Sequence, residues 1–296
     1  MKEKLKKEGS ILKLSVLFSA IYLLIEIVAA VISNSQTILT DCIFGIADLM
    51  IIVVISFLLP LIYKPVTEKR PYGYSQIESV FVVIKGISVS IITIFLIKEN
   101  VEILLSGGSQ LDFSNILIFN IALEIFCICA YLYLKRKSKK IDTPVIESDL
   151  IVWKIDIYTT LGMFVAFLLQ YILSFTKLSF IVPYIDSTFA IIISIVLLKE
   201  PILMVIDAFK SLFLFAPEKE TVDEIKEIVN EKIEKYPYDV TFYDVVKTGR
   251  KIWIELYIKC ENSNINLKEL KQAKKEVEKS LKKEFDEIYV EFTPEI

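Results

Sequence analysis

Six runs of apolar residues dominate the sequence, each close to the ~20 residues that a helix needs to cross a bilayer. They occupy residues 11–33, 38–63, 77–98, 113–134, 148–174 and 180–204. Hydrophobic residues make up 54% of the 296-residue chain, which is typical of a membrane protein and not of a soluble domain. We therefore expect an α-helical integral membrane protein with a six-transmembrane-helix bundle. The lysine-rich segment 1–9 leads into a first span that has no small-residue cleavage site, which predicts a signal anchor retained as the first helix.

The composition changes at Pro217 from apolar to charged, with the periodicity of a soluble domain. The pattern predicts a helix over 218–236, a hairpin of strands 240–246 and 251–259, a helix over 267–284 and a strand over 287–292. This order indicates a small α+β domain of ferredoxin-like type. We expect two domains, a transmembrane domain at 1–216 and a cytosolic dimerisation domain at 217–296, with one side of the sheet as the dimer contact.

The basic residues between the apolar runs predict the orientation of the chain. One set of connectors holds most of them, whereas the opposite set holds little more than Lys98 and Lys177. Both termini should therefore be cytoplasmic. The basic side carries Lys2, Lys4, Lys6, Lys7, Lys64, Lys69, Arg70, Lys135, Arg136, Lys137, Lys139 and Lys140.

Two of the apolar runs each carry a pair of aspartates seven residues apart, Asp41 with Asp48 and Asp149 with Asp156. This spacing stacks each pair on one helical face about 10 Å apart. A charged residue at the bilayer centre costs roughly 2.5–3.5 kcal/mol on insertion scales, so it usually faces a polar cavity or a partner. The pattern indicates a path for a cation, with Asp48 and Asp156 as core ligands near mid-depth.

Several other polar residues in the apolar runs have more than one interpretation. Asp41 and Asp149 belong either to the ion path, as accessory groups, or to a helix N-terminus that an acidic residue stabilises locally. Lys85 is a counter-ion to a nearby aspartate, a snorkelling residue or a gating element. Glu26 and Glu78 serve either the path or packing and capping.

The composition excludes several classes of function. The chain has no histidine, so a metal site must use oxygen ligands, which disfavours a histidine-type zinc site and favours ions such as Mn²⁺ or Mg²⁺. Its four cysteines show no CxxC spacing. No nucleophile–base pairing or phosphate-binding glycine loop is present, so we do not expect an enzyme. The net charge of −3 does not indicate nucleic acid binding.

Taken in order, the polar residues resemble those of the cation diffusion facilitator (cation efflux) family. Asp48 and Asp156 fall at family spacing, and the run Arg70-Pro71-Tyr72-Gly73-Tyr74-Ser75-Gln76-Ile77-Glu78 is similar to the family's H-P-x-G-H-x-K-x-E loop. The resemblance implies six transmembrane helices, a cytosolic ferredoxin-like domain and a homodimer. It also rests on Glu26, Ser33, Ser35, Asp41, Glu147, Ser148, Asp149, Asp186 and Pro217.

The chain departs from the family at several ligand positions. The transport site of the family has four ligands, and the resemblance carries them to Phe44 with Asp48 and Val152 with Asp156, so half of the site is missing. Arg70 and Tyr74 stand at the loop histidines. Gln76 stands at a lysine position, and Tyr243 and Cys260 lie near metal-binding histidines of the cytosolic domain.

The resemblance and the aspartates together predict a transporter of a divalent metal cation, working by proton-coupled efflux and alternating access. Water, backbone carbonyls or Thr159 would complete an all-oxygen site that favours Mn²⁺, Fe²⁺ or Co²⁺ over zinc. The expected partners are the metal cation, protons, the lipid bilayer and a second copy of the chain, with no organic cofactor and no nucleic acid. We expect the plasma membrane of a prokaryote.

A second hypothesis follows from the missing ligands at Phe44 and Val152. The chain would be a transport-silent family member that acts as a dimer partner or regulatory subunit. Its aspartates would then be structural, neutralised by Lys85 and Lys154 in ion pairs within the membrane.

Overall fold

The computed structural model describes residues 2–33, 36–108, 116–139, 141, 143–260, 266–285 and 287–295. The side chains of residues 32–33, 36–41, 116–120, 163, 167 and 260 lie outside this description. The chain forms two compact units. The helical unit comprises Met1–Tyr63 and Phe81–Ile206, and the C-terminal unit comprises Lys64–Val80 and Asp207–Ile296.

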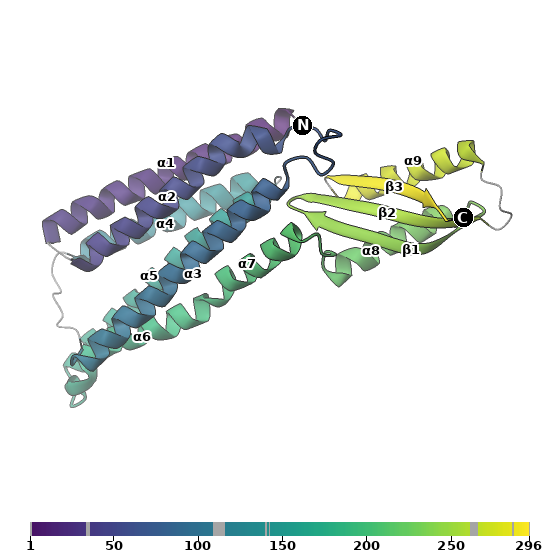
Figure 1. Cartoon of the computed structure of the whole chain (residues 1–296). Coiled ribbons are helices and arrows are strands. Elements are labelled where there is room, and N and C mark those ends of the chain that lie inside the picture. Colours follow the sequence, from purple (N-terminus) through teal and green to yellow (C-terminus); the bar gives the residue numbers. More distant parts are fainter. Residues whose placement is uncertain are drawn as a thin grey trace. The chain divides into compact units, whose positions relative to one another are not determined.

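Long helices follow one another through the first two thirds of the chain (Figure 1). Within the helical unit α1 packs along α2 and α4, and α5 packs along α4 and α6. Their bounds are α1 Lys2–Ser33, α2 Gln36–Ile62, α3 Gln76–Leu105, α4 Ile116–Ser138, α5 Pro144–Ser174, the short 3-10 helix η1 Ser179–Ile181, α6 Val182–Leu197 and α7 Lys199–Leu212.

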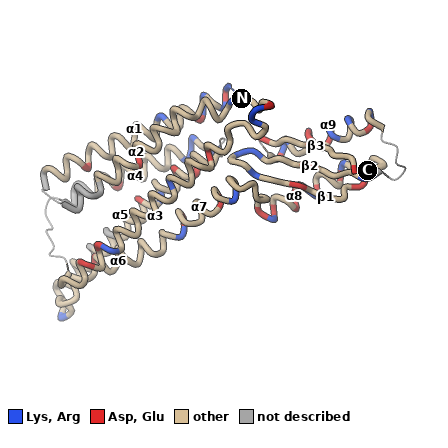
Figure 2. Tube along the Cα trace, viewed as in Figure 1, with Lys and Arg blue, Asp and Glu red and all other residues tan. Residues whose placement is uncertain are grey.

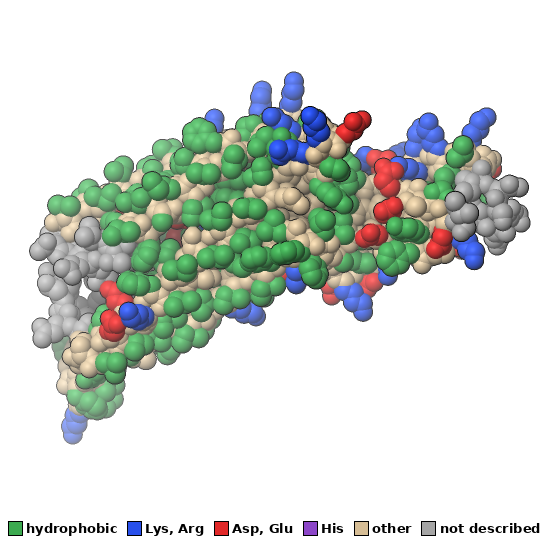
Figure 3. Space-filling view, in the orientation of Figure 1, with side chains coloured by type: hydrophobic (Ala, Val, Ile, Leu, Met, Phe, Trp, Pro, Cys, Tyr) green, Lys and Arg blue, Asp and Glu red, His purple; other side chains and the backbone are tan. Residues whose placement is uncertain are grey.

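Five segments among the described residues are long and apolar enough to cross a membrane: Lys2–Val31, Cys42–Ile62, Gln76–Leu105, Pro144–Ser174 and Ser179–Leu212. The predicted span 113–134 coincides largely with α4, whose first residues have undescribed side chains. Large apolar side chains point outward from these helices, for example Phe57 with 80% of its surface exposed. Such a surface would aggregate in water, so it indicates contact with lipid (Figure 3).

Two helix boundaries show how local sequence shapes the bundle. α5 begins at Pro144, and the Thr143 hydroxyl caps it by accepting a hydrogen bond from the Ile146 backbone N–H. The predicted span 180–204 is divided at Leu198, because Pro201 has no N–H to donate to the Leu197 carbonyl. The chain continues after Pro201 as helix α7 to Leu212.

The C-terminal unit carries a three-stranded sheet with strand order β1-β2-β3. β1 and β2 form an antiparallel hairpin, and β2 and β3 are parallel. The predicted order of helix, two strands, helix and strand is confirmed. The bounds are α8 Lys219–Ile233, β1 Tyr238–Thr248, β2 Lys251–Cys260, α9 Leu267–Glu284 and β3 Ile288–Pro294.

The core of this sheet lies under α8 and α9. Alternate residues of β2 are buried, namely Ile252, Ile254, Leu256 and Ile258, as expected for a strand with one covered face. They pack against the apolar faces of the two helices. Charged side chains are dense over this part of the chain and sparse along the long helices (Figure 2).

Candidate functional site

A cavity of about 220 Å³ lies inside the helical unit, and both core aspartates of the sequence analysis line it. Asp48 reaches it from α2 and Asp156 from α5, so the structure brings together two residues that are more than a hundred positions apart. Most of the remaining polar wall consists of hydroxyl groups, which are oxygen ligands that a hard cation accepts. They belong to Ser19, Tyr22, Ser88, Thr93, Thr159, Thr160 and Ser194.

Lys85 of α3 lies between two of the predicted aspartates. Its side chain is completely buried, and its Nζ lies 2.7 Å from Asp149 Oδ1 and 3.4 Å from Asp48 Oδ1. A buried ammonium requires such partners because removal from water disfavours the charged form. The counter-ion interpretation of Lys85 is therefore confirmed, and snorkelling is wrong, because the side chain is completely buried in the bundle.

A hydrogen-bonded chain extends the ion pair to α1. Ser15 Oγ donates to Asp149 Oδ2 at 2.5 Å and accepts from Trp153 Nε1 at 3.2 Å. Asp149 is buried one turn beyond the start of α5, whose cap is Thr143. The local capping interpretation of Asp149 is therefore wrong, because its carboxylate is occupied by side chains of α1 and α3.

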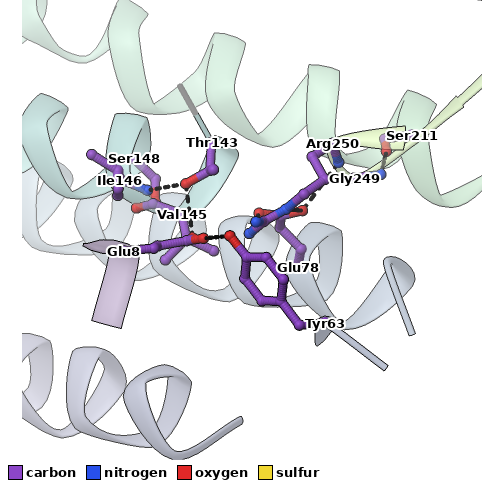
Figure 4. Close-up of polar contacts among 10 residues, drawn as sticks. All are labelled: Glu8, Tyr63, Glu78, Thr143, Val145, Ile146, Ser148, Ser211, Gly249 and Arg250. Atoms are coloured by element: carbon purple, nitrogen blue, oxygen red, sulfur yellow. Dashed lines mark hydrogen bonds and ion pairs between the residues drawn. The ribbon is translucent and has the colours of Figure 1, made fainter. Parts of the chain in front are cut away.

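A second buried polar cluster lies nearer the start of α1 (Figure 4). The Glu8 carboxylate accepts a hydrogen bond from Tyr63 Oη at 2.5 Å and another from Thr143 Oγ1 at 3.0 Å. Glu8 is completely buried although it lies in the lysine-rich segment that was predicted to precede the first span. This cluster joins α1, α2 and the start of α5.

The apolar residues at the two family ligand positions also line the cavity. Phe44 packs edge to face against Phe95, with 5.7 Å between the ring centroids, and Val152 lies on the wall next to Trp153. Neither side chain offers an atom to a metal ion. Among the described residues no group of three or more Asp, Glu or Cys side chains is arranged to hold one, so a cation here would also need hydroxyl, carbonyl or water oxygens.

Sequence reasoning missed an acidic residue of α4. Both carboxylate oxygens of Glu124 are buried, and the Thr160 hydroxyl is a polar neighbour of this carboxylate. Glu124, Glu26 and Asp156 all lie near the Cys127 thiol, and Glu26 also lines the cavity. An acidic residue inside an apolar run was the available signal, as it was for the aspartates.

Two further residues of the sequence analysis lie apart from the cavity or cannot be placed. Lys154 forms an ion pair with Glu200 at 3.0 Å, so its predicted role as a counter-ion to the aspartates is wrong. The Asp41 side chain lies outside the described residues, although its backbone belongs to α2.

The C-terminal unit has different side chains at the family's other metal positions. The Arg70 guanidinium stacks over the Tyr74 ring, 4.2 Å from its centroid. Tyr243 Oη donates to Asn230 Oδ1, and burial raises the pKa of Tyr243 to about 12, which keeps it a neutral phenol near pH 7. The Cys260 side chain lies outside the described residues.

Within the C-terminal unit the tip of the β1–β2 hairpin contacts the first turn of α3 (Figure 4). The Glu78 carboxylate is completely buried and accepts hydrogen bonds from Arg250 N, Nε and Nη2 at 2.7–3.1 Å. Gly249 N donates to Ser211 Oγ at 2.7 Å. Glu78 therefore has a packing role, one of the two interpretations left open for it.

Comparison with known proteins supports the interpretation of the cavity. A model of the cation efflux transmembrane domain matches residues 12–213. The manganese efflux system protein MneP of Bacillus subtilis (strain 168) is 22% identical over 201 residues, which are 67% of this chain and 66% of that protein. The chain thus spans just under two thirds of the length of this relative.

The family match covers more than half of the chain and includes every predicted site residue of the membrane domain. Cation efflux is a transport function and not a catalysed reaction, which agrees with the prediction that the chain is not an enzyme. The sequence resemblance is confirmed, and the chain belongs to the cation efflux family.

Proposed function

We propose that the chain carries a divalent metal cation across a membrane, with Asp48 and Asp156 as the core ligands. The observation that carries this proposal is the shared cavity, because two carboxylates from different helices face one space inside an apolar bundle. A cation is the partner that such a pair favours most. Hydroxyl groups such as that of Thr159, together with water, would complete the oxygen shell.

The proposed cation is Mn²⁺ or a similar hard ion. The chain has no histidine, and the described wall of the cavity has no thiol, so the donor set consists of oxygens. The relative MneP is named a manganese efflux protein, which supports the same choice. Asp41 and Asp149 are proposed as accessory groups of the path.

The transport cycle that we propose is proton-coupled efflux by alternating access. Two carboxylates facing one cavity repel each other when both are ionised, so a proton can replace the departing cation. The proposed assembly is a homodimer, with six membrane spans at 1–216, a ferredoxin-like dimerisation domain at 217–296 and both termini in the cytoplasm of a prokaryote. The excess of basic residues in one set of connectors supports this orientation.

Reconstitution into vesicles that enclose a Mn²⁺-sensitive dye tests the proposal. We expect the wild type to move Mn²⁺ down an imposed gradient, and Asp48→Asn and Asp156→Asn to reduce the flux to that of empty vesicles. Asp207→Asn is the matched control, because Asp207 is an exposed residue of α7 that pairs with Lys210. Unchanged flux in Asp48→Asn and Asp156→Asn would contradict the proposed ligands.

The pairing of Asp48 with Lys85 favours a second candidate, the transport-silent dimer partner. In that case Asp48 is neutralised permanently and no cation replaces Lys85. The same vesicles should then show no flux of Mn²⁺, Fe²⁺, Co²⁺ or Zn²⁺.

A further inference from the structure

The position of Lys85 along the bundle shows that its ion pair lies at one end of the cavity. The ion-pair cluster consists of Ser15 on α1, Lys85 on α3 and Asp149 on α5. On each of these three helices, every residue that lines the cavity comes later in the sequence than the cluster residue. Glu8 lies seven residues before Ser15, or about 10 Å along the helix. Two buried polar layers therefore separate the cavity from the end of the bundle at which α1 begins.

The two contacts of Lys85 differ in length. The distance of 2.7 Å to Asp149 is that of a charge-assisted hydrogen bond, whereas the distance of 3.4 Å to Asp48 exceeds the usual range. Asp48 is also the more accessible carboxylate, with 23% of its side chain exposed against 6% for Asp149. Lys85 thus holds Asp149 firmly and Asp48 loosely, and Asp48 faces the cavity.

A cation that binds Asp48 must come close to the Lys85 ammonium. Like charges a few ångströms apart in a bundle interior repel strongly, so the cation and the ammonium cannot share Asp48 without a movement of Lys85. Lys85 would have to shift toward Asp149 or away from both carboxylates, and either movement disturbs the layer that joins α1, α3 and α5.

We propose that the Lys85 ammonium takes the place of the transported cation at Asp48 in the empty protein, and that the arriving cation displaces it. Displacement loosens the Lys85–Asp149–Ser15 layer, which otherwise closes the path toward the start of α1. Lys85 thus competes with the cation for Asp48 from within the protein, which weakens cation binding and speeds cation release. The inference rests on the proposed function, because it takes Asp48 as a ligand of the transported cation.

The first test measures Mn²⁺ affinity in detergent by equilibrium binding. The double variant Lys85→Met/Asp149→Asn removes the competitor and its partner together and preserves the net charge. We expect its Mn²⁺ dissociation constant to fall about tenfold, within the ~5–150-fold range usual for coupled ligands. In vesicles its KM should fall together with kcat. A purely structural lysine would instead leave Mn²⁺ affinity unchanged or weaker, and that result overturns the competitor role.

The double variant Lys154→Met/Glu200→Gln is the matched control, because it removes a lysine of the same bundle together with its partner and also preserves the net charge. It should leave the Mn²⁺ dissociation constant unchanged. An equal tightening in Lys154→Met/Glu200→Gln would overturn the inference, since the effect would then not depend on the lysine that faces the aspartates.

The second test measures whether the Lys85–Asp149–Ser15 layer blocks access to the cavity, and it does not depend on transport. In a background without native cysteines, Ser19→Cys places a thiol on the cavity wall, and Lys4→Cys marks the side of the membrane at which α1 begins. A membrane-impermeant thiol reagent added on that side should label Ser19→Cys slowly. Adding Lys85→Met/Asp149→Asn to Ser19→Cys should raise the labelling rate. Mn²⁺ should also raise the labelling rate of Ser19→Cys alone. Mn²⁺ should have no such effect when Asp48→Asn is also present.

The outcomes separate this inference from the proposed function. If Mn²⁺ is transported but neither Mn²⁺ nor the double variant changes the labelling rate, the closing role of Lys85 is wrong and the proposed function stands. If the wild type neither binds nor transports Mn²⁺, the proposed function and the displacement fail together. Faster labelling of the double variant would then still support the closed layer alone.

Discussion

At the scale of single residues, the cavity combines an acidic pair with apolar side chains at positions where the family has ligands. Phe44 and Val152 remove two donors and leave Asp48 and Asp156. In the proposed function the ion would then be held by fewer charged groups and more neutral oxygens. Weak, oxygen-based coordination suits a hard divalent ion better than it suits zinc, which binds nitrogen and sulfur ligands tightly.

Restoring a nitrogen ligand should therefore change ion selectivity. We expect Phe44→His to raise the affinity for Zn²⁺ relative to Mn²⁺ by about tenfold, as one added ligand worth ~1.4 kcal/mol would do. Competition of the two ions for transport in vesicles measures this ratio. Leu197→His places the same side chain on a cavity wall formed by α6, which carries neither core aspartate, and should leave the ratio nearly unchanged. Equal shifts in both variants would contradict the assigned ligand position.

Ser15 offers a second test at this scale, because it links Asp149 with Trp153. Ser15→Ala leaves the Trp153 N–H and one Asp149 oxygen without this partner, at an expected cost of about 1–3 kcal/mol. Thermal unfolding in detergent measures the loss. Ser56→Ala is the control, since Ser56 Oγ donates to the Ile52 carbonyl within its own helix. If the two variants were equally stable, the buried network would have no energetic role.

At the scale of secondary structure, a close approach of α3 and α7 depends on one glycine. A Cβ at Gly86 would lie 2.5 Å from Val205 Cγ2 and 3.1 Å from the Pro201 carbonyl oxygen. These distances are shorter than ordinary van der Waals contacts. The first turns of α7, which follow the break at Leu198, can therefore pack against α3 only where α3 has no side chain.

Gly86→Ala should consequently lower the stability of the protein, although alanine is the better helix former. Overpacking typically costs about 1–3 kcal/mol, which exceeds the gain of about 1 kcal/mol in helix propensity. Gly9→Ala in α1 is the matched control, because its nearest neighbour would lie at an ordinary 3.5 Å. The unfolding temperature should fall for Gly86→Ala and rise for Gly9→Ala. A rise in both would show that α3 and α7 can separate without cost.

At the scale of the whole molecule, the C-terminal unit is held together by contacts between segments far apart in the sequence. Glu78 and Arg250 are 172 residues apart and form a buried ion pair at the hairpin tip. Gly249 permits this approach, since its φ is +58° and a Cβ would lie 2.6 Å from the Ser75 carbonyl oxygen. The loop before α3 is thereby part of the unit that contains the sheet.

Removing one partner of this pair should destabilise the C-terminal unit more than removing both. Arg250→Met leaves the Glu78 carboxylate buried without the guanidinium, at an expected cost of about 3–5 kcal/mol, whereas the double variant Glu78→Gln/Arg250→Met removes both charges of the pair. Hydrogen exchange at the hairpin tip and at the first turn of α3 measures the local opening. If the destabilisation by Glu78→Gln and that by Arg250→Met summed to that of the double variant, the two side chains would not interact.

The sequence by itself determined the class of the protein, because hydropathy and helical period are local properties of a chain. The apolar runs, the change in composition at Pro217 and the strand alternation around Gly249 gave elements that the structure contains. The seven-residue spacing within each aspartate pair is also a local property, and it identified Asp48 and Asp156, which line the cavity.

Only the tertiary structure decided which polar groups meet. Lys85 pairs with Asp48 and Asp149 while Lys154 pairs with Glu200, and nothing in the spacing of the two lysines distinguishes them. The buried Glu8 was likewise not recognisable as part of the bundle interior, because it lies in the lysine-rich segment before the first apolar run. The partner of a buried charge depends on which helices pack together and how each is rotated, and these are properties of the assembled bundle.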